Sequence, residues 1–315
     1  MTLLPYIVTY AAICVFVIAV IARFLMWAKM PIHMRWELYP VAHEGKKASY
    51  GGSYLEEVDW WKKPKESSMI GELGAMIPEI LFLVALKEHN RKLWSVSFPF
   101  HFGLYLVIFS GLLMIGSAIL GAIIPSIIVG SFGTLLKVSI IFCGIAGLGL
   151  SLLGALGLLV RRLADSELKD FTSPADIFNL LFFLVTFGFV MVHIFLLDHD
   201  FARFSFFAYN LVTFKMAVLP GTNFQVLLTT IAICLMALLM AYIPLTHMSH
   251  FVGKYFAYHS IRWNDDPNTP GSKHEKTIGN VLNYPVSWAA PHIKGDGKKT
   301  WADVATADIA KEENK

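Results

Sequence analysis

Five long apolar blocks dominate this chain of 315 residues and limit what it can fold into. At a rise of ~1.5 Å per residue, each block is long enough to cross a hydrocarbon core of ~30 Å as a helix. Charged residues make up only 16 % of the chain, against about 25 % in an ordinary soluble domain. We therefore predict an all-α membrane protein, a bundle of five transmembrane helices. The blocks are Leu3–Trp27, Phe98–Ile124, Leu135–Val160, Pro174–Leu197 and Phe224–Met248.

Positive charges in the connecting segments predict the orientation of the chain. The connections after the first and third blocks are basic, as is the tail, whereas the connection 125–134 carries no charge. Because basic loops stay in the cytoplasm, we expect the N-terminus outside and the C-terminus inside, in the cytoplasmic (inner) membrane. The first block has no basic leader and no small-residue cleavage site, so we interpret it as a retained helix. The basic residues of the two loops are Arg35, Lys46, Lys47, Lys62, Lys63, Lys65, Lys87, Arg91, Lys92, Arg161, Arg162 and Lys169.

This map divides the chain into a first transmembrane helix (1–29), a cytoplasmic loop (30–97), a four-helix membrane bundle (98–252) and a soluble cytoplasmic tail (253–315). Two further apolar segments fall outside the simple spans. We predict that Glu72–Trp94 lies on the inner face of the membrane and that Arg203–Leu219 lies on the outer face.

Histidines near the ends of two predicted spans are the main candidates for chemistry, because ionisable residues are rarely kept in a membrane helix without a use. His101 lies just inside the second span, and His247 and His250 lie at the end of the fifth. The predicted topology puts both groups at the cytoplasmic side. Two imidazoles at one depth suit a b-type haem, whose iron takes one nitrogen from each face of the macrocycle. The alternative is interfacial histidines bonded to headgroups or backbone.

The three cysteines do not favour a sulfur-bound cofactor. Cys14, Cys143 and Cys234 each lie within an apolar block, and none has a partner at the spacing of a metal, haem-attachment or cluster motif. The third span also carries a face of small residues at Gly144, Gly147, Ser151 and Gly154. Such a face lets either a neighbouring helix or a flat macrocycle come close.

At the predicted outer side the candidates are Lys137, His193, Asp198 and His199. A cation at the depth of Lys137 needs a partner, for which a quinone carbonyl or a haem propionate would serve, unless the side chain reaches the headgroups instead. For His193 three roles are open: ligand of an outer haem, hydrogen-bond donor to a quinone, or an ordinary buried histidine. His199 is a weaker candidate for the same quinone or haem.

Residues 95–252 resemble the membrane cytochrome b of respiratory nitrate reductase, its gamma subunit. The segment Phe98-Pro-Phe-His101-Phe-Gly-Leu-Tyr resembles the first ligand segment of that family, and Ile243-Pro-Leu-Thr-His-Met-Ser-His250 resembles the last. The resemblance implies haem ligation by His101 and His250, with His247 as an alternate to His250. It also implies a quinol site at Lys137 near the outer face, from which electrons pass inward to an iron–sulfur subunit.

Two departures from the family pattern concern a second, outer haem. The family has another histidine on its second helix where this chain has Gly111, and one near the start of its fifth helix, where Ala232 and its neighbours include none. The resemblance therefore implies one haem b, the inner one, with a matching residue for each of its two ligands. A second haem would need other ligands, of which His193 is the obvious one.

The long first loop resembles a narrower branch of the family. Its segments Trp36-Glu-Leu-Tyr-Pro and Tyr50-Gly-Gly-Ser-Tyr-Leu-Glu-Glu-Val-Asp-Trp-Trp61 are similar to those of anaerobes such as sulfate reducers. There the cytochrome is paired with a heterodisulfide-reductase-like iron–sulfur subunit, as in Dsr- and Tmc-type complexes. We accordingly expect a cytochrome b subunit that transfers electrons between menaquinone and a cytoplasmic iron–sulfur protein. A periplasmic multihaem cytochrome c is a further candidate partner, and no nucleic acid is expected.

Two other classes of protein stay open at this point. In a cofactor-free membrane anchor or a transporter, the histidines could be replaced without loss of function. A transporter would also have charged residues along its spans, and this chain has almost none there besides Lys137. An enzyme active on its own is not favoured, because no nucleophile–base set, phosphate loop or zinc motif is present. We expect an electron-transfer subunit of a larger oxidoreductase, which is not catalytic alone.

Overall fold

A computed structural model describes residues 3–30, 40–45, 47–65, 67–169, 171–290 and 293–307. The regular elements in this part of the chain are helices and helical turns, apart from one antiparallel pair of two-residue strands, β1 (Ala289–Ala290) and β2 (Ile293–Lys294). The predicted all-α class and the five predicted spans are confirmed. Five helices of the described residues are long and apolar enough to cross a membrane: α1 (Leu4–Ala28), α4 (Arg91–Ile123), α6 (Ser131–Ala164), α8 (Pro174–Leu197) and α10 (Asn223–Leu245).

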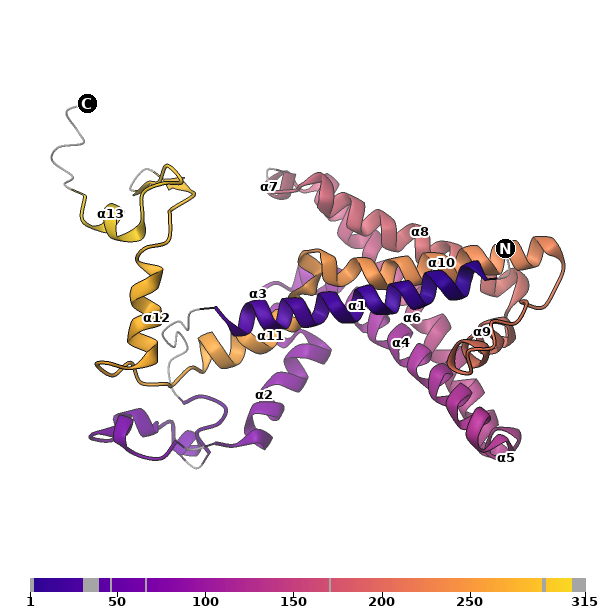
Figure 1. Ribbon diagram of the computed structural model, residues 1–315, viewed down its shortest axis with the longest axis horizontal. Coiled ribbons are helices and arrows are strands. Elements are labelled where there is room, and N and C mark those ends of the chain that lie inside the picture. Colours follow the sequence, from indigo (N-terminus) through magenta and orange to yellow (C-terminus); the bar gives the residue numbers. More distant parts are fainter. Residues whose placement is uncertain are drawn as a thin grey trace. The chain divides into compact units, whose positions relative to one another are not determined.

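The remaining elements are short and lie between or after the five long helices (Figure 1). They are the 3-10 turns η1 (Lys47–Tyr50), η2 (Tyr54–Glu56), η3 (Trp60–Lys62) and η4 (His247–Ser249), the π-helical turn η5 (Ala257–Arg262), and the helices α2 (Met69–Phe82), α3 (Val84–His89), α5 (Pro125–Val129), α7 (Ser166–Lys169), α9 (Ala202–Val212), α11 (His250–Phe256), α12 (Lys273–Val281) and α13 (Trp301–Ala305).

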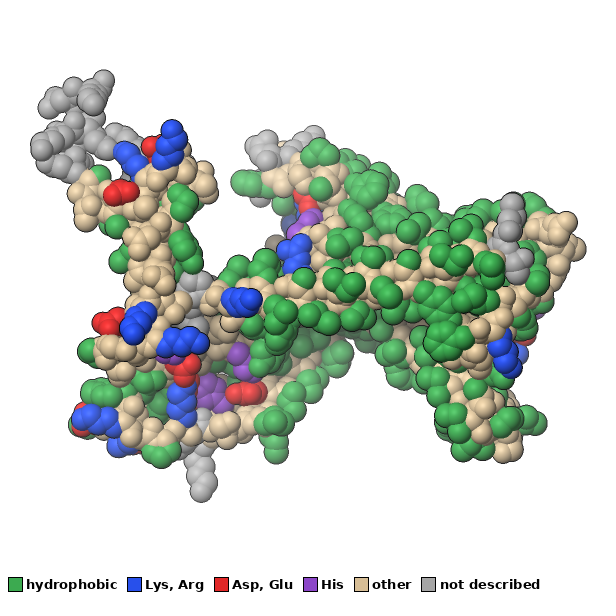
Figure 2. All heavy atoms as spheres, in the orientation of Figure 1, with side chains coloured by type: hydrophobic (Ala, Val, Ile, Leu, Met, Phe, Trp, Pro, Cys, Tyr) green, Lys and Arg blue, Asp and Glu red, His purple; other side chains and the backbone are tan. Residues whose placement is uncertain are grey.

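The chain forms two compact units. The first, here called the membrane unit, comprises Met1–Val20 and Ala75–Ser249, and the second, the loop–tail unit, comprises Ile21–Gly74 and His250–Lys315. Hydrophobic side chains cover the visible faces of α1, α8 and α10 (Figure 2). Large apolar residues such as Val185 and Phe195 on α8 are more than half exposed. In water such faces would be unstable, so they are surfaces for lipid.

Local sequence explains where the long helices begin. Ser173 and Asp176 form a capping box at the start of α8, with Pro174 as the first helical residue. Thr222 and Gln225 form the same box before α10. Each box satisfies backbone N–H groups that have no partner within the helix, which matters because an unpaired N–H in lipid is costly.

Helices α4 and α6 pack with their backbones in contact, and the small-residue face of α6 is what allows it. A Cβ atom on Gly147 would lie 2.7 Å from the backbone nitrogen of Val107, and one on Gly154 would clash with the backbone of Phe100. The Ser110 hydroxyl donates a hydrogen bond of 2.8 Å to the carbonyl of Ile140. Of the two uses open for this face, the structure shows helix packing, which leaves no room there for a macrocycle.

This close packing leads to a first prediction. Alanine normally stabilises a helix relative to glycine by roughly 0.5–1 kcal/mol. We expect Gly154→Ala to lower stability instead, by about 1–3 kcal/mol, because its methyl group overpacks the contact with Phe100. The matched control is Gly111→Ala on α4, where nothing lies within 4 Å of the added atom. Thermal unfolding of both variants in one detergent tests this, and equal melting temperatures would contradict it.

The apolar core of the membrane unit lies where α8 packs on α6 and α10 packs on α8. Phe183 on α8 meets Phe100 edge-on, with ring centroids 5.0 Å apart. The first half of α1 lies instead against α9, where the Tyr6 hydroxyl donates to the carbonyl of Ala217 at 2.9 Å and the Tyr10 hydroxyl donates to that of Leu211 at 2.6 Å. The pair α4–α6 is thus the centre of the unit.

Several element ends differ from those expected. The segment Glu72–Trp94 forms two helices and the start of α4, because Leu83 adopts a left-handed conformation (φ 52°) and the Asn90 side chain caps α4. The fifth span ends at Leu245 rather than Met248, since the Thr246 hydroxyl bonds to the backbone of Ile243 and Met248. Arg35, Lys46 and residues 36–39 of the distinctive loop lie outside the described residues.

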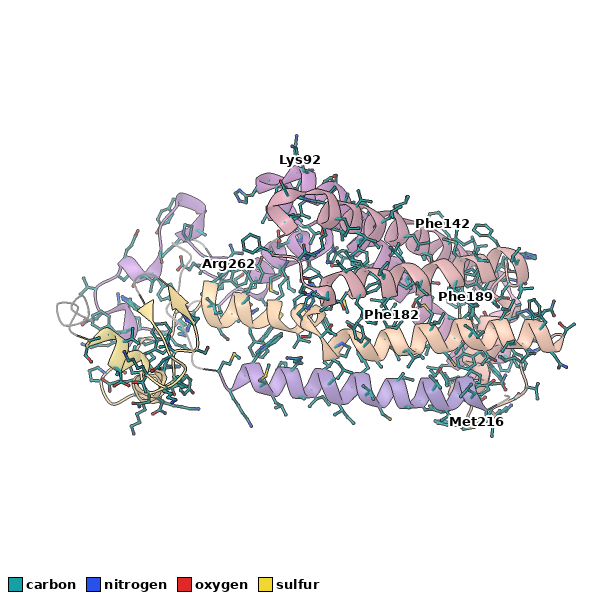
Figure 3. The ribbon with its side chains drawn as sticks, turned by 90° about the horizontal axis from the view of Figure 1, so that it is seen from above. Lys92, Phe142, Phe182, Phe189, Met216 and Arg262 are labelled. Carbon is teal, nitrogen blue, oxygen red and sulfur yellow. The ribbon has the colours of Figure 1, made fainter. Side chains whose placement is uncertain are left out.

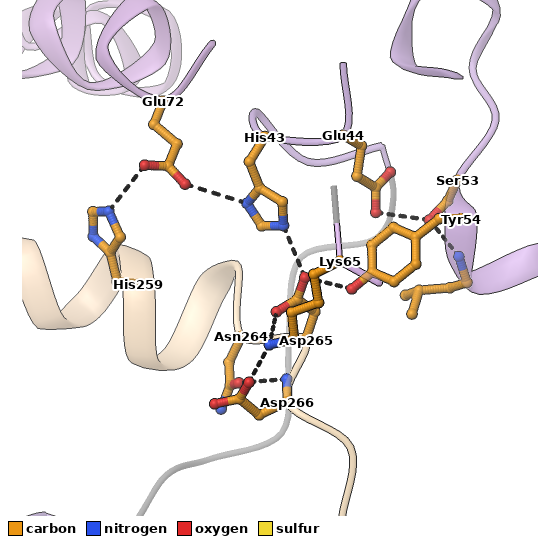
Figure 4. Close-up of polar contacts among 11 residues, drawn as sticks. His43, Glu44, Ser53, Tyr54, Lys65, Glu72, His259, Asn264, Asp265 and Asp266 are labelled. Carbon is orange, nitrogen blue, oxygen red and sulfur yellow. Dashed lines mark hydrogen bonds and ion pairs between the residues drawn. The ribbon is translucent and has the colours of Figure 1, made fainter. Parts of the chain in front are cut away.

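The loop–tail unit is held together by a polar network around Asp265 (Figure 4). The imidazole of His43 donates to Asp265 at 3.0 Å and lies 3.6 Å from a carboxylate oxygen of Glu72. Lys65 donates to Asp265 at 2.8 Å and Tyr54 also donates to it. Burial raises the pKa of Asp265, but these three donors outweigh it and hold the pKa well below its usual range. The network ties the first loop to the segment after η5.

Candidate functional site

His101 lies on α4 one turn after Ser97, and its own helix holds it in one orientation. Its Nδ1 atom lies 2.8 Å from the carbonyl oxygen of Ser97 and 3.3 Å from the Ser97 hydroxyl. A carbonyl oxygen can only accept, so Nδ1 carries the proton and Nε2 has the lone pair. Histidines that bind metals are held in this way, with the other ring nitrogen donating to a carbonyl or carboxylate. The ring of Phe100 meets the imidazole edge-on.

The two histidines after α10 have different surroundings. His247 in η4 is directed to the start of α8, where its Nε2 lies 3.4 Å from the Asn179 amide and 3.6 Å from the Asp176 carboxylate. His250 is the first residue of α11 and is exposed. His247 thus has polar partners on α8. His101 belongs to the membrane unit and His250 to the loop–tail unit, so their pairing at one iron stays a prediction.

The orientation of His101 fits one protein ligand of a haem. Among the described residues no three His, Cys, Asp or Glu side chains gather as a metal-binding group. A haem needs only two axial ligands from the protein, because the macrocycle supplies the other four. The Nε2 lone pair of His101, aimed by the Ser97 carbonyl, is one suitable ligand.

A cavity of ≈ 270 Å³ lies at the other end of the α4–α6 pair. Two residues of its lining form an ion pair: the Lys137 ammonium donates a hydrogen bond of 3.1 Å to the Asp200 carboxylate. Burial raises the pKa of Asp200, but the Lys137 ammonium and the backbone N–H of Ala202 outweigh it and lower the pKa below its ordinary value. The predicted partner of Lys137 is therefore supplied in part by the chain itself. The cavity is lined by Ser117, Ile128, Gly133, Thr134, Lys137, Ile140, Asp200, Phe201, Ala202 and Ser205.

Asp198 does not line the cavity but stabilises the backbone next to it. It is 1 % exposed, and its carboxylate accepts the backbone N–H groups of Arg203 and Phe204 at the start of α9. Burial raises its pKa, although these N–H groups oppose the change. The intervening Phe201 has φ 58° and its ring lies against Gly144, whose missing side chain leaves the space. These contacts hold Asp200 beside Lys137.

His193 is the most enclosed of the candidate residues, at 3 % exposed. Its Nε2 lies 2.9 Å from the Thr229 hydroxyl of α10, and that hydroxyl donates to the carbonyl of Gln225 at 2.8 Å. The hydroxyl hydrogen is thereby used, so Nε2 must donate and the lone pair is on Nδ1. Nδ1 is buried and has no hydrogen-bond partner among the described residues. A buried acceptor of this kind suits a donor from a bound molecule.

Sequence reasoning named Lys137 and His193 but missed Asp200 and Thr229 as their partners. The signal for Asp200 was present, since Asp198 and Asp200 stand together just before a short helix. His199, between them, is exposed and does not line the cavity.

Comparison with known proteins gives one match. A family model described as nitrate reductase gamma subunit matches residues 86–264, more than half of the chain. The matched range contains α4, α6, α8 and α10 together with His101, Lys137, His193 and His250. No curated protein and no solved structure matches the chain.

Proposed function

Because this chain belongs to the nitrate reductase gamma subunit family, we propose that it is the cytochrome b subunit of a membrane redox complex. It would transfer electrons between menaquinol and an iron–sulfur subunit. The observation that carries the proposal is the orientation of His101, whose Nδ1 donates to the Ser97 carbonyl at 2.8 Å and so carries the proton, which is the tautomer that a haem ligand bound through Nε2 requires. His250, which stands on the last ligand position of the family motif, would be the second ligand.

A b-type haem, when bound, supplies a carrier that takes up and passes on one electron at a time. The chain's own residues would do the rest. Lys137 would bind an oxygen of the quinol in the cavity beside it, because an ammonium donates strong hydrogen bonds to such an oxygen. The carboxylate of Asp200, which lies beside Lys137 in the lining and is ionised at neutral pH, would accept a proton as the quinol is oxidised. Two electrons and two protons leave the quinol in each turnover.

We further propose the orientation and partners of the subunit. The basic loops favour an outside N-terminus and a cytoplasmic C-terminus in the inner membrane, so the Lys137 cavity would face outward and His101 inward. Electrons moving inward while protons are released outside would be electrogenic. The distinctive first loop favours a heterodisulfide-reductase-like iron–sulfur partner in the cytoplasm, with a periplasmic multihaem cytochrome c as a second partner.

The structure also bears on how His193 would act. Its Nε2 donates to Thr229, and an outer haem bound through that nitrogen would have to break this bond. We therefore propose that the chain binds one haem. His193 is 3 % exposed and does not line the Lys137 cavity, so we propose that its Nδ1 accepts a hydrogen bond from the quinol once neighbouring side chains move aside. His193→Ala should keep its haem while its KM for menaquinol rises about 10-fold, the loss of one buried hydrogen bond. Loss of haem in this variant would assign His193 to a second haem instead.

The experiment that tests the function is a pyridine haemochrome assay on the purified full-length chain, with haem and protein measured on the same sample. One haem b per chain that is reduced by a menaquinol analogue supports the proposal. A chain that inserts normally but shows no Soret absorption would be an anchor or a transporter, and the proposal would be wrong.

A further inference from the structure

A groove lies at the corner where α2, α3 and α4 meet, far in the sequence from the residues of the proposed quinol site. It has a volume of ≈ 590 Å³ and is lined by Phe82, Val84, Lys87, Glu88, Arg91 and Trp94. The corner is tied together by polar bonds: the Trp94 indole N–H donates to the carbonyl of Phe82 at 2.8 Å, and the Ala85 N–H donates to Glu79 at 2.8 Å. We call it the corner groove.

In the part of the chain that the structure describes, the cations of the corner groove form no ion pair. Lys87, Arg91 and the adjacent Lys92 make no ion pair with a carboxylate within the described residues. Four lysines earlier in the same loop do: Lys47, Lys62, Lys63 and Lys65 each pair with Asp or Glu. Glu88 is the one acid in the lining. The Lys87 ammonium lies over the Trp94 ring, 5.5 Å from its centroid, and Figure 3 shows Lys92 projecting away from the ribbon. The groove thus offers positive charge to an anion from outside.

An aromatic row continues from the corner groove along α4. The rings of Trp94 and Phe98 are stacked 4.9 Å apart, and those of Phe98 and Phe102 5.4 Å apart. These residues recur at every fourth position, so they follow one face of the helix into its apolar part. Phe82, in the groove lining, is 49 % exposed beside them. Tryptophan with Lys and Arg at the head of an apolar helix is typical of the membrane–water interface.

From this arrangement we propose that the corner groove binds one anionic phospholipid. The phosphate would be held by Lys87 and Arg91, and an acyl chain would lie along Phe98 and Phe102. A free phosphate shares the headgroup chemistry but would make no use of the aromatic row. Basic pockets beside transmembrane helices bind the headgroups of anionic lipids for these reasons. The site stands apart from the proposed electron transfer, since a chain without haem would still bind the lipid.

The test measures lipid that stays with the full chain. The protein is exchanged from native membranes into detergent, and bound phospholipid per chain is counted by native mass spectrometry. It is then titrated with short-chain phosphatidylglycerol or phosphatidylcholine. We expect about fivefold weaker phosphatidylglycerol binding for each cation lost, and so roughly 25-fold for Lys87→Gln/Arg91→Gln. The charge-conserving pair Lys87→Arg/Arg91→Lys should bind as wild type and shows that the corner still folds.

The matched control is Lys215→Gln, because Lys215 also lies over an aromatic ring, 5.4 Å from the centroid of Tyr209, but outside the corner groove. It should leave lipid binding unchanged. Equal loss in Lys215→Gln, or equal affinity for the two lipids, would overturn the proposal. Displacement of bound phosphatidylglycerol by inorganic phosphate at the same concentration would also overturn it, because the groove would then be a simple anion site.

Discussion

The His101→Ala variant is expected to lose its b-type haem while its five helices still insert into the membrane. The imidazole is oriented by its own helix through the Ser97 carbonyl, and nothing else in that turn could take its place as a ligand. Removing the group that hydrogen-bonds to a metal ligand lowers metal affinity roughly 10–100-fold. Removing the ligand itself should therefore lower the amount of haem per chain by at least ~tenfold. The pyridine haemochrome assay measures it, with the amount of membrane-inserted chain as reference.

Three further variants make that result specific. Ser97→Ala removes a hydroxyl 3.3 Å from Nδ1 but keeps the carbonyl at 2.8 Å, so it should retain haem. His250→Ala should lose haem as His101→Ala does. His247→Ala should keep it, because His247 is directed to Asn179 and Asp176 of α8. If His101→Ala and His250→Ala both keep their haem, the assignment of the axial ligands fails.

The second large effect is expected at the Lys137 cavity. Lys137→Gln should lower kcat/KM for menaquinol by about 10- to 150-fold, the value of a charge-assisted hydrogen bond of ~1.5–3 kcal/mol. Its haem content should not change, since Lys137 lies at the opposite end of the α4–α6 pair from His101. Stopped-flow reduction of the haem by a menaquinol analogue measures the rate.

The Lys137–Asp200 contact needs its own control, because an ion pair can be merely structural. A structural pair predicts that Lys137→Gln/Asp200→Asn recovers activity, since neither charge is then left alone. A quinol site predicts that the double variant is at least as slow as Lys137→Gln, because Asp200 would also be missing as a proton acceptor. His199→Ala, next to Asp200 but exposed, should react as wild type. Recovery in the double variant, or unchanged rates in Lys137→Gln, would remove Lys137 from the quinol site.

The sequence predicted the spans well because the signals for a membrane helix are local. The bounds of α8 agree with the prediction because Ser173, Pro174 and Asp198 mark its ends within a few residues. It predicted the other ends less well. The break at Leu83 depends on a backbone conformation that apolar content does not encode, and the end of α10 depends on how the Thr246 hydroxyl bonds.

For the candidate site, the sequence predicted single residues but not the residues that contact them. Sequence reasoning found His101, Lys137 and His193, since ionisable groups are rare in apolar helices. It did not find Asp200, which lies 63 residues from Lys137 along the chain, or Thr229, which joins α10 to His193 across 36 residues. Hydrogen bonds between distant segments depend on how helices pack, and no local pattern records them.

The small-residue face of α6 shows most clearly how the two sources of information divide. Its spacing in the sequence determined that something would come close to Gly144, Gly147, Ser151 and Gly154, because small side chains on one face leave room. Only the tertiary structure decided that the backbone of α4 fills this room along Gly147 and Gly154 and that the ring of Phe201 covers Gly144. Hydrophobic periodicity is a property of each helix alone, whereas the choice of neighbour depends on the free energy of packing several helices together.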